Sequence, residues 1–387
     1  MPEIDSIAWS PYAPLRWRDE LWWTYGRLAA KEGLVTATGQ IASTLPEMIQ
    51  GNLIAAMMAG GRGYLETLPA DDRGHIAGQM LAKFMEMRHW VPLVGQYEAN
   101  GRQIFDLHDA LSEALLHTDV GDCSMEGLSL PYDCFFLAFG KQAEIRVPWE
   151  DDFEYADGAF VAVTPWDCGD GTYKRRYKIG LSTVKKDGSG VMMPGYFLDF
   201  TPDEALMPVQ QAIDVAISRR KAAFLEGTNA GPQDHALASH RIADLEDGAI
   251  LARKALLLVF NAMFYLESLH ELPSESPGRD TSSSLSAKWS ASAPAKRHKV
   301  KSELTANGYA VVRLVGAEVA GDAAAAKSRT DGVRTHWRRG FFRMQAHGPA
   351  MTLRKRLWVR PTVVNASKDS VVDTPGHIYI PGGNSAH

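Results

Sequence analysis

The feature that most constrains this fold is the stretch from Ala249 to Leu266, the most apolar segment of the 387-residue chain. Arg253 and Lys254 interrupt it near its start, which disfavours a membrane span. A long apolar segment that does not enter a membrane must be covered by other parts of the protein. The sequence therefore predicts a buried helix over about residues 240–267 at the centre of the core, and no membrane partner.

Composition and cysteine usage indicate a soluble cytoplasmic protein. The chain is 45% hydrophobic and 22% charged, which excludes a wholly disordered or collagen-like protein. Its N-terminus lacks the basic and apolar regions of a secretory signal. The three cysteines, Cys123, Cys134 and Cys168, form no Cys-x-x-Cys pair and no zinc-binding pattern. We therefore expect free thiols in a reducing compartment, no metal and no cofactor.

Hydrophobic periodicity predicts the helices and strands. Helical spacing occurs over residues 47–67, 75–90 and Ile104–Leu116, and Thr201-Pro202-Asp203-Glu204 is a helix start signal before a helix over 203–221. The run Cys134–Phe139 is typical of a strand buried on both faces. Further strands are expected at Glu144–Val147, Gly158–Val163, Thr172–Val184, Met192–Phe200, Tyr309–Val315, 335–343 and 354–364, with hairpin turns at Gly169-Asp170-Gly171 and 186–190.

A serine-rich segment interrupts this pattern. Eight serines fall within residues 271–295, which predicts a flexible linker over 271–300. Trp289 within it is either a docking handle or incidental, and the segment ends in the basic cluster Lys296-Arg297-His298-Lys299.

The fold class expected from these patterns is α+β, with central antiparallel strands between helical blocks. The expected regions are a mainly helical region 1–118, a β-rich region 119–200, a helical region 201–270 that completes an α+β body, the Ser/Pro-rich linker 271–300, and a small basic β-rich C-terminal unit 301–387.

Charge is segregated along the chain. Residues 327–360 hold ten Lys or Arg against the single acid Asp331, for a formal charge of +9. Because the whole chain carries −5, the other residues carry −14. The overall acidity therefore does not argue against a nucleic-acid partner, since the cations are concentrated in one window.

Within this window, a strand period of two places Arg354, Arg356, Trp358 and Arg360 on one face. Lys355, Leu357 and Val359 fall on the other face. Guanidinium groups beside an indole suit phosphate contact and base stacking. The nucleic-acid-binding residues predicted on the two strands are Arg334, His336, Trp337, Arg338, Arg339, Arg343, Arg354, Lys355, Arg356, Trp358 and Arg360.

Two alternatives remain open for this basic hairpin. Its arginines would pair with the acidic body, and its aromatic residues would form a small core, in a purely structural protein. In a metal-independent ribonuclease, His336 or His347 would act as acid or base beside arginines that stabilise the transition state. No other catalytic arrangement occurs in the obvious positions.

The segment His336-Trp337-Arg338-Arg339-Gly340-Phe341-Phe342-Arg343, followed by Leu357-Trp358-Val359-Arg360-Pro361-Thr362-Val363-Val364-Asn365, resembles the C-terminal signature of a family of phage and plasmid proteins. That family includes a type V-A anti-CRISPR protein. Weaker likenesses, at Leu130–Cys134, Glu154–Val161 and Phe264–Glu267, follow in the same order, so the resemblance spans about residues 85–365.

The resemblance implies a mobile-element regulatory protein. The characterised anti-CRISPR relative lowers production of the Cas nuclease by recognising its nascent N-terminal peptide and promoting loss of the messenger. Relatives often carry His where this chain has Phe341, which favours binding over catalysis at this position. The leading hypothesis is a non-enzymatic protein whose body binds a host protein or nascent peptide, such as that of a type V Cas nuclease, and whose basic hairpin contacts RNA or the ribosome.

Overall fold

The computed structural model describes residues 10–45, 66, 67, 69, 89–140, 145–149, 152–185, 197–227, 234–269, 271–319 and 336–364. The helices expected over 47–67 and 75–90 lie outside this part of the chain, except for residues 66, 67, 89 and 90, which are helical. The turn expected at 186–190 also lies outside it.

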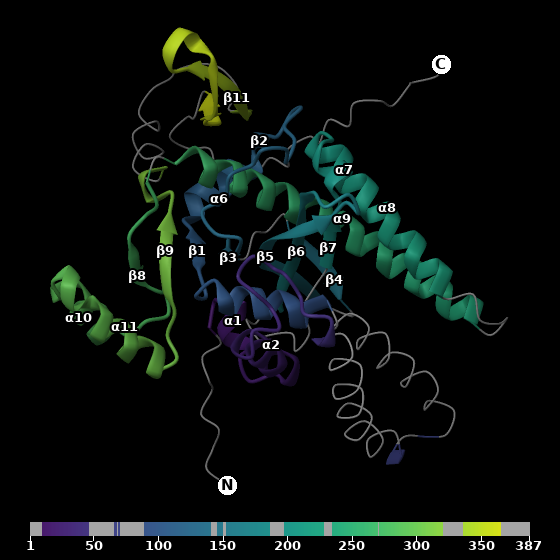
Figure 1. The fold of residues 1–387 in the computed structure, drawn as a ribbon, viewed down its shortest axis with the longest axis horizontal. Coiled ribbons are helices and arrows are strands. Elements are labelled where there is room, and N and C mark those ends of the chain that lie inside the picture. The colour runs from purple at the N-terminus through teal and green to yellow at the C-terminus, as the bar shows by residue number, and fades with distance from the viewer. Residues whose placement is uncertain are drawn as a thin grey trace.

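The fold is α+β, as expected, and a large mixed sheet forms its centre (Figure 1). The strand order is β7-β6-β5-β3-β1-β9-β8, and β4 pairs with β5. β1 runs parallel to both β3 and β9, whereas the other pairs in this sheet are antiparallel. The strands are β1 (Ile104–Leu107), β3 (Cys134–Ala138), β4 (Arg146–Trp149), β5 (Asp152–Asp167), β6 (Tyr173–Lys185), β7 (Phe197–Phe200), β8 (Glu275–Pro277) and β9 (Val311–Val315).

The single helix expected over Ile104–Leu116 is wrong in its first turn. Residues 104–107 form β1, and all four are buried because a core covers each face of the sheet at this strand. Helix α6 (Asp109–Leu116) begins after His108, whose ring nitrogen accepts a hydrogen bond from Ala110 N at 3.2 Å. The sequence does not show this boundary, because a short strand buried on both faces has apolar residues that also fit the spacing of a helix.

Helices cover both faces of the sheet. On one face lie α1 (Ala13–Arg16), α2 (Leu21–Lys31) and a helix over 89–99, with an aromatic core around Phe160. On the other face lie α6, α8 (Val209–Gly227) and α9 (Asp234–Ser268). β3 contributes alternate residues to the two cores, so the prediction of a strand buried on both faces is confirmed.

Helix α9 contains the apolar stretch, and its side chains between Ala255 and Leu266 form much of one core. The prediction of a central buried helix is confirmed. Within the described segments, no helix has the length and apolar character needed to cross a membrane. Because the core includes α9 as far as Leu266, the last turn of this helix, which ends at Ser268, offers a fixed surface on which another element can pack.

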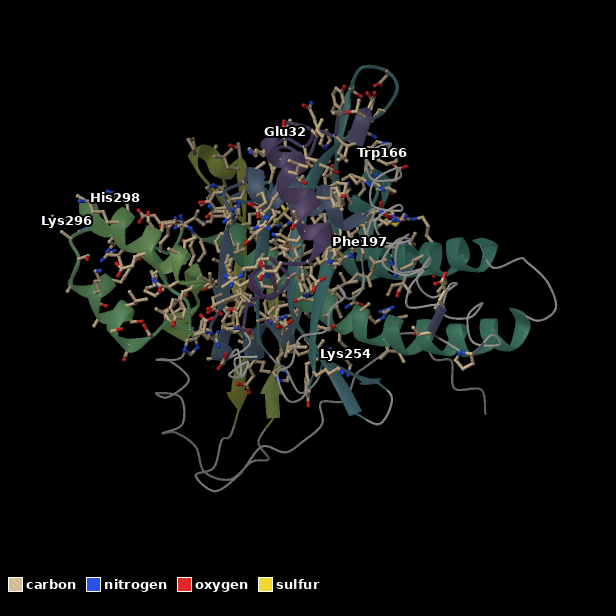
Figure 2. All side chains as sticks on the ribbon, turned by 90° about the horizontal axis from the view of Figure 1, so that it is seen from below. Glu32, Trp166, Phe197, Lys254, Lys296 and His298 are labelled. Carbon is tan, nitrogen blue, oxygen red and sulfur yellow. The ribbon has the colours of Figure 1, made fainter. Side chains whose placement is uncertain are left out.

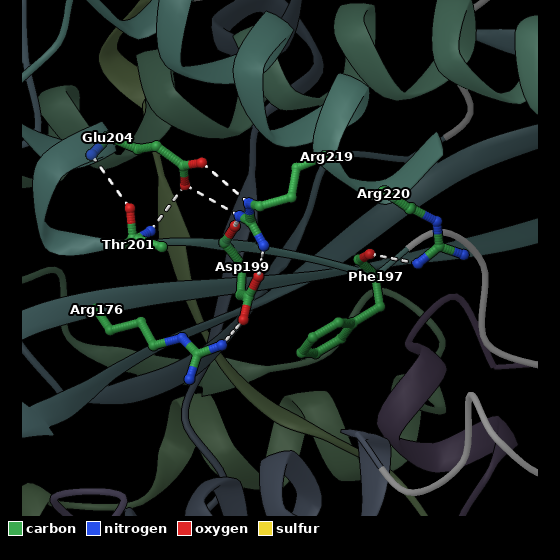
Figure 3. Close-up of polar contacts among 7 residues, drawn as sticks. All are labelled: Arg176, Phe197, Asp199, Thr201, Glu204, Arg219 and Arg220. Atoms are coloured by element: carbon green, nitrogen blue, oxygen red, sulfur yellow. Dashed lines mark hydrogen bonds and ion pairs between the residues drawn. The ribbon is translucent and has the colours of Figure 1, made fainter. Parts of the chain in front are cut away.

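The start signal at Thr201 produces the short helix α7 (Pro202–Ala205) before α8 (Figure 3). Thr201 and Glu204 form a reciprocal capping box, as the sequence predicts. Arg219 of α8 joins Glu204 and Asp199 at 3.0 and 2.9 Å, and Arg176 of β6 also pairs with Asp199. This network fastens α7 and α8 to the edge of the sheet.

The flexible linker expected over 271–300 is wrong, because this segment is folded. It contains β8, α10 (Ser283–Ala291), the 3-10 turn η2 (Pro294–Lys296) and the start of α11 (Arg297–Ala306). Trp289 is buried between the two helices with Val300 and Leu304, so it is a core residue of this unit. Arg279 fixes the segment to the sheet through both carboxylate oxygens of buried Asp106, each at 2.8 Å.

Candidate nucleic-acid interface

The basic window forms a hairpin of β11 (Gly340–His347) and β12 (Leu353–Val359), joined by η3 (Pro349–Met351). β11 also pairs in parallel with β2 (Thr118–Asp119) of the body, so the hairpin extends from the body rather than forming a separate unit (Figure 1). The preceding β10 (His336–Arg338) pairs with β13 (Thr362–Val364).

One face of the hairpin packs on the end of α9. Phe342 and Trp358 are opposite each other in the register, and they contact Phe264 and Tyr265 with ring centroids 5.5 and 5.1 Å apart. The Trp358 Nε1–H donates to Thr118 Oγ1 at 3.1 Å. These contacts bury apolar surface between segments far apart in the sequence, so they fix the hairpin to the body.

Arg356 completes this docked face. Its guanidinium pairs with the Glu267 carboxylate and lies 4.1 Å above the Phe264 ring. Its side chain is 8% exposed, whereas that of Glu267 is 20% exposed. Arg356 and Trp358 therefore serve the docking of the hairpin, which is the arrangement that the structural alternative describes.

Gly340 permits the close approach of β11 to the body. A Cβ at this position would lie 2.6 Å from Pro361 Cδ and 2.7 Å from Thr118 Oγ1. Gly340 N also donates to the His117 carbonyl at 3.1 Å. The glycine of the Arg339-Gly340 step is therefore required by packing.

Replacing Gly340 with alanine should lower the free energy of unfolding by about 1–3 kcal/mol, the usual effect of overpacking. Chemical denaturation measures the change. Gln345→Ala, at an exposed position on the same strand, is the matched control and should change stability by less than about 0.5 kcal/mol. Equal stability of the two variants would contradict this role for Gly340.

The predicted binding residues fall into distinct environments. Arg338, Arg339, Arg343 and Arg354 are exposed. Lys355, Trp358 and Arg360 are half-buried, and Arg356 is buried. His336 and Trp337 lie opposite Val364 and Val363 in the backbone register, and Arg334 lies outside the described residues.

The alternation expected for β12 is confirmed, but the face chosen for ligand contact is the one that docks on α9. The opposite face carries Arg343 and Lys355 beside Phe341 and Leu357, which are 44% and 38% exposed. Phe341 and Leu357 are surface residues that the charge pattern does not identify. The same period of two would have identified them, because it places Phe341 and Leu357 on the face opposite Arg356 and Trp358.

The groups at the base of the hairpin are not prepared for acid–base chemistry. Burial and the Glu318 carboxylate, which accepts a hydrogen bond from the Tyr265 hydroxyl at 2.5 Å, raise the pKa of Tyr265. Burial also raises the pKa of the Cys123 thiol, although nearby Arg356 opposes the effect. Both groups therefore stay protonated at neutral pH, which makes each a poor base or nucleophile.

The two histidines of the ribonuclease alternative do not share a site. His336 begins β10, whereas His347 ends β11 at the tip of the hairpin. The eight residues of β11 alone span about 24 Å at 3.3–3.4 Å per residue. In the described part of the chain, no cluster of three or more His, Cys, Asp or Glu residues could hold a metal ion, and all three cysteines are free.

A comparison with protein families agrees with the resemblance at the hairpin. The family model named AcrVA2-like, described as the anti-CRISPR type V subtype A2 family, matches residues 105–366. A structure titled "Crystal structure of AcrVA2" aligns with 89% of this chain and 96% of its own, at 14% identity and a TM-score of 0.37. No curated protein matches the chain.

Proposed function

Because the chain belongs to the AcrVA2-like, anti-CRISPR type V subtype A2 family, we propose that it lowers the production of a CRISPR nuclease in the cytoplasm of its host. In this proposal the exposed cations of the hairpin contact RNA or the ribosome. The body holds a host protein or nascent peptide, such as the start of a type V Cas nuclease. The chain itself cleaves no RNA.

The observation that carries the proposal is that some residues of the hairpin dock it on α9, whereas other cations on it stay exposed. Arg356 and Trp358 anchor the hairpin to α9, whereas Arg343 and Arg354 remain exposed on it, and Arg338 is exposed on the neighbouring β10. Arg354 lies near the tip, opposite Ala346, whereas Arg343 lies in the middle of β11, opposite Leu357 and on the other face of the hairpin. A fixed strand pair with cations on both faces suits the backbone of an RNA strand.

Replacing both Arg343 and Arg354 with Glu should weaken RNA and ribosome association at low salt by at least about tenfold. The reason is that each reversal removes one phosphate contact and adds a repulsion. Sedimentation with ribosomes and titration with labelled RNA measure the loss. In cells that also produce a type V-A nuclease, the native chain should lower the nuclease and its messenger, and the double variant should restore both.

The matched control is the double variant Lys31→Glu, Lys185→Glu, which makes the same charge change at exposed positions on α2 and β6. It should bind RNA nearly as well as the native chain. Equal losses in the two double variants would show a general charge effect and contradict a hairpin interface. Unchanged nuclease levels with the native chain would contradict the proposed function itself.

A further inference from the structure

A second positively charged surface lies at the junction of α10 and α11, away from the hairpin. Residues 283–306 hold Lys288, Lys296, Arg297, Lys299 and Lys301 against the single acid Glu303. Figure 1 shows α10 and α11 beyond β8, far from β11. Figure 2 shows Lys296 and His298 at the outer end of this helix pair.

The cations of this surface stand on a fixed frame. Trp289, Val300 and Leu304 are buried between the two helices. The Arg297 guanidinium lies 5.5 Å from the centroid of the Trp289 ring. Arg297 is thus held by the indole, which is itself 5% exposed. Trp289 is therefore not available for stacking on a base.

Internal ion pairs use only some of these charges. Lys301 pairs with Glu275 at 2.7 Å, and Lys288 pairs with Glu303. Lys296 and Lys299 are exposed and make no ion pair with the residues that the structure describes. An open pocket of about 420 Å³ lies at the junction of α10 and α11, lined by Glu275, Trp289, Pro294, Arg297, His298 and Lys301.

The position of the cations on α11 is unfavourable for the helix itself. The first turn holds Arg297, His298 and Lys299 without an acid, and the N-cap residue Lys296 makes no side-chain cap bond. A cation in the first turn of a helix opposes the macrodipole, and one favourable charge there is worth about 0.3–1 kcal/mol. A bound anion would relieve this repulsion.

We propose that this α11 surface binds the phosphate backbone of a nucleic-acid strand. Lys296, the N-cap residue of α11, and Lys299, in its first turn, are three residues apart, so their Cβ atoms lie about 5–6 Å from each other. Exposed cations spread along a surface suit a repeated anion better than a single small one. With no available aromatic face, binding is independent of base sequence. This surface goes beyond the hairpin interface and does not depend on it.

The test uses the full chain and a labelled 20-nucleotide single-stranded RNA of mixed sequence. The double variant Lys296→Glu, Lys299→Glu should bind it roughly tenfold more weakly at low salt. Removing two phosphate contacts should also reduce the slope of log K against log salt by about 1.4, or about 0.7 per contact. A single-stranded DNA of the same length should bind like the RNA. The milder Lys296→Gln, Lys299→Gln variant should lose less affinity in the same direction.

The Lys31→Glu, Lys185→Glu variant is again the control for net charge. In the native chain, RNA should protect Lys296 and Lys299 from acylation by an amine-reactive ester, and Lys31 should react equally with or without RNA. The α11 site would be overturned if the Lys296→Glu, Lys299→Glu variant bound RNA as well as the control variant does. It would also be overturned if RNA gave these lysines no protection in the native chain. Either result would leave the hairpin proposal standing, since Arg343 and Arg354 are tested separately. If the Lys296→Glu, Lys299→Glu variant lost binding to an acidic peptide but kept its binding to RNA, the nucleic-acid site would also be overturned. The α11 surface would then be assigned to a protein partner.

Discussion

Replacing Arg356 with Met should lower the free energy of unfolding by about 3 kcal/mol. Breaking a buried ion pair by removing one partner costs about 3–5 kcal/mol, because the other charge is left buried and unpaired. The lower end of that range applies here, since the Glu267 side chain is 20% exposed and also accepts a hydrogen bond from Ser129 N. The contact between the guanidinium and the Phe264 ring is lost as well.

The matched control is Arg354→Met, two residues earlier on the same face of β12. Arg354 is exposed, so its replacement should change stability by less than about 0.5 kcal/mol. Chemical denaturation of both variants measures the contrast, and limited proteolysis reports whether the hairpin has left α9. Adding Glu267→Gln to Arg356→Met should recover part of the loss, because the unpaired charge is then removed. Equal stability of the two arginine variants would show that the hairpin is not held by this pair.

The contrast between Arg354 and Arg356 also shows how far the sequence predicts the hairpin. The period of two predicts correctly that Arg354, Arg356 and Trp358 share a face. It does not predict which face is free. That choice depends on Phe264, Tyr265 and Glu267, which lie about ninety residues earlier in the chain and meet β12 only in the fold. Local patterns fix the alternation along a strand, whereas burial depends on distant contacts.

The same physical limit explains the wrong linker over residues 271–300. Its composition has few apolar residues, which is typical of flexible segments. Three buried side chains, Trp289, Val300 and Leu304, are nevertheless enough to hold α10 against α11. β8 adds backbone pairing to β9, and Arg279 adds an ion pair with buried Asp106. The last two contacts join segments that are distant in the sequence, so composition alone does not reveal them.

The second large effect concerns Lys178 on β6, the strand next to the edge strand β7. Burial, together with the nearby positive charge of Arg176, lowers the pKa of Lys178 to about 8 from the ordinary 10.5. The folded protein therefore releases this proton at a lower pH than the unfolded chain does. Between about pH 8 and pH 10.5 the unfolded chain binds more protons, so stability rises with pH across this window.

Replacing Lys178 with Met should therefore stabilise the protein by about 3 kcal/mol at pH 7, since each unit of pKa shift corresponds to about 1.4 kcal/mol. The gain should shrink as pH rises from 8 and be nearly absent at pH 10.5, where the native lysine is already neutral. Urea denaturation at pH 7 and pH 10 measures both values.

Lys174→Met is the control for Lys178→Met, because Lys174 is exposed on the same strand and its replacement should change stability by less than about 0.5 kcal/mol at either pH. Other groups also titrate between pH 8 and pH 10.5, but they contribute equally to the stability of the native chain and of both variants. The difference between variants therefore isolates residue 178. A gain from Lys178→Met that is the same at pH 7 and pH 10 would show that the effect comes from packing of the methionine. In that case the partly buried ammonium of Lys178 would not lower the stability of the folded protein.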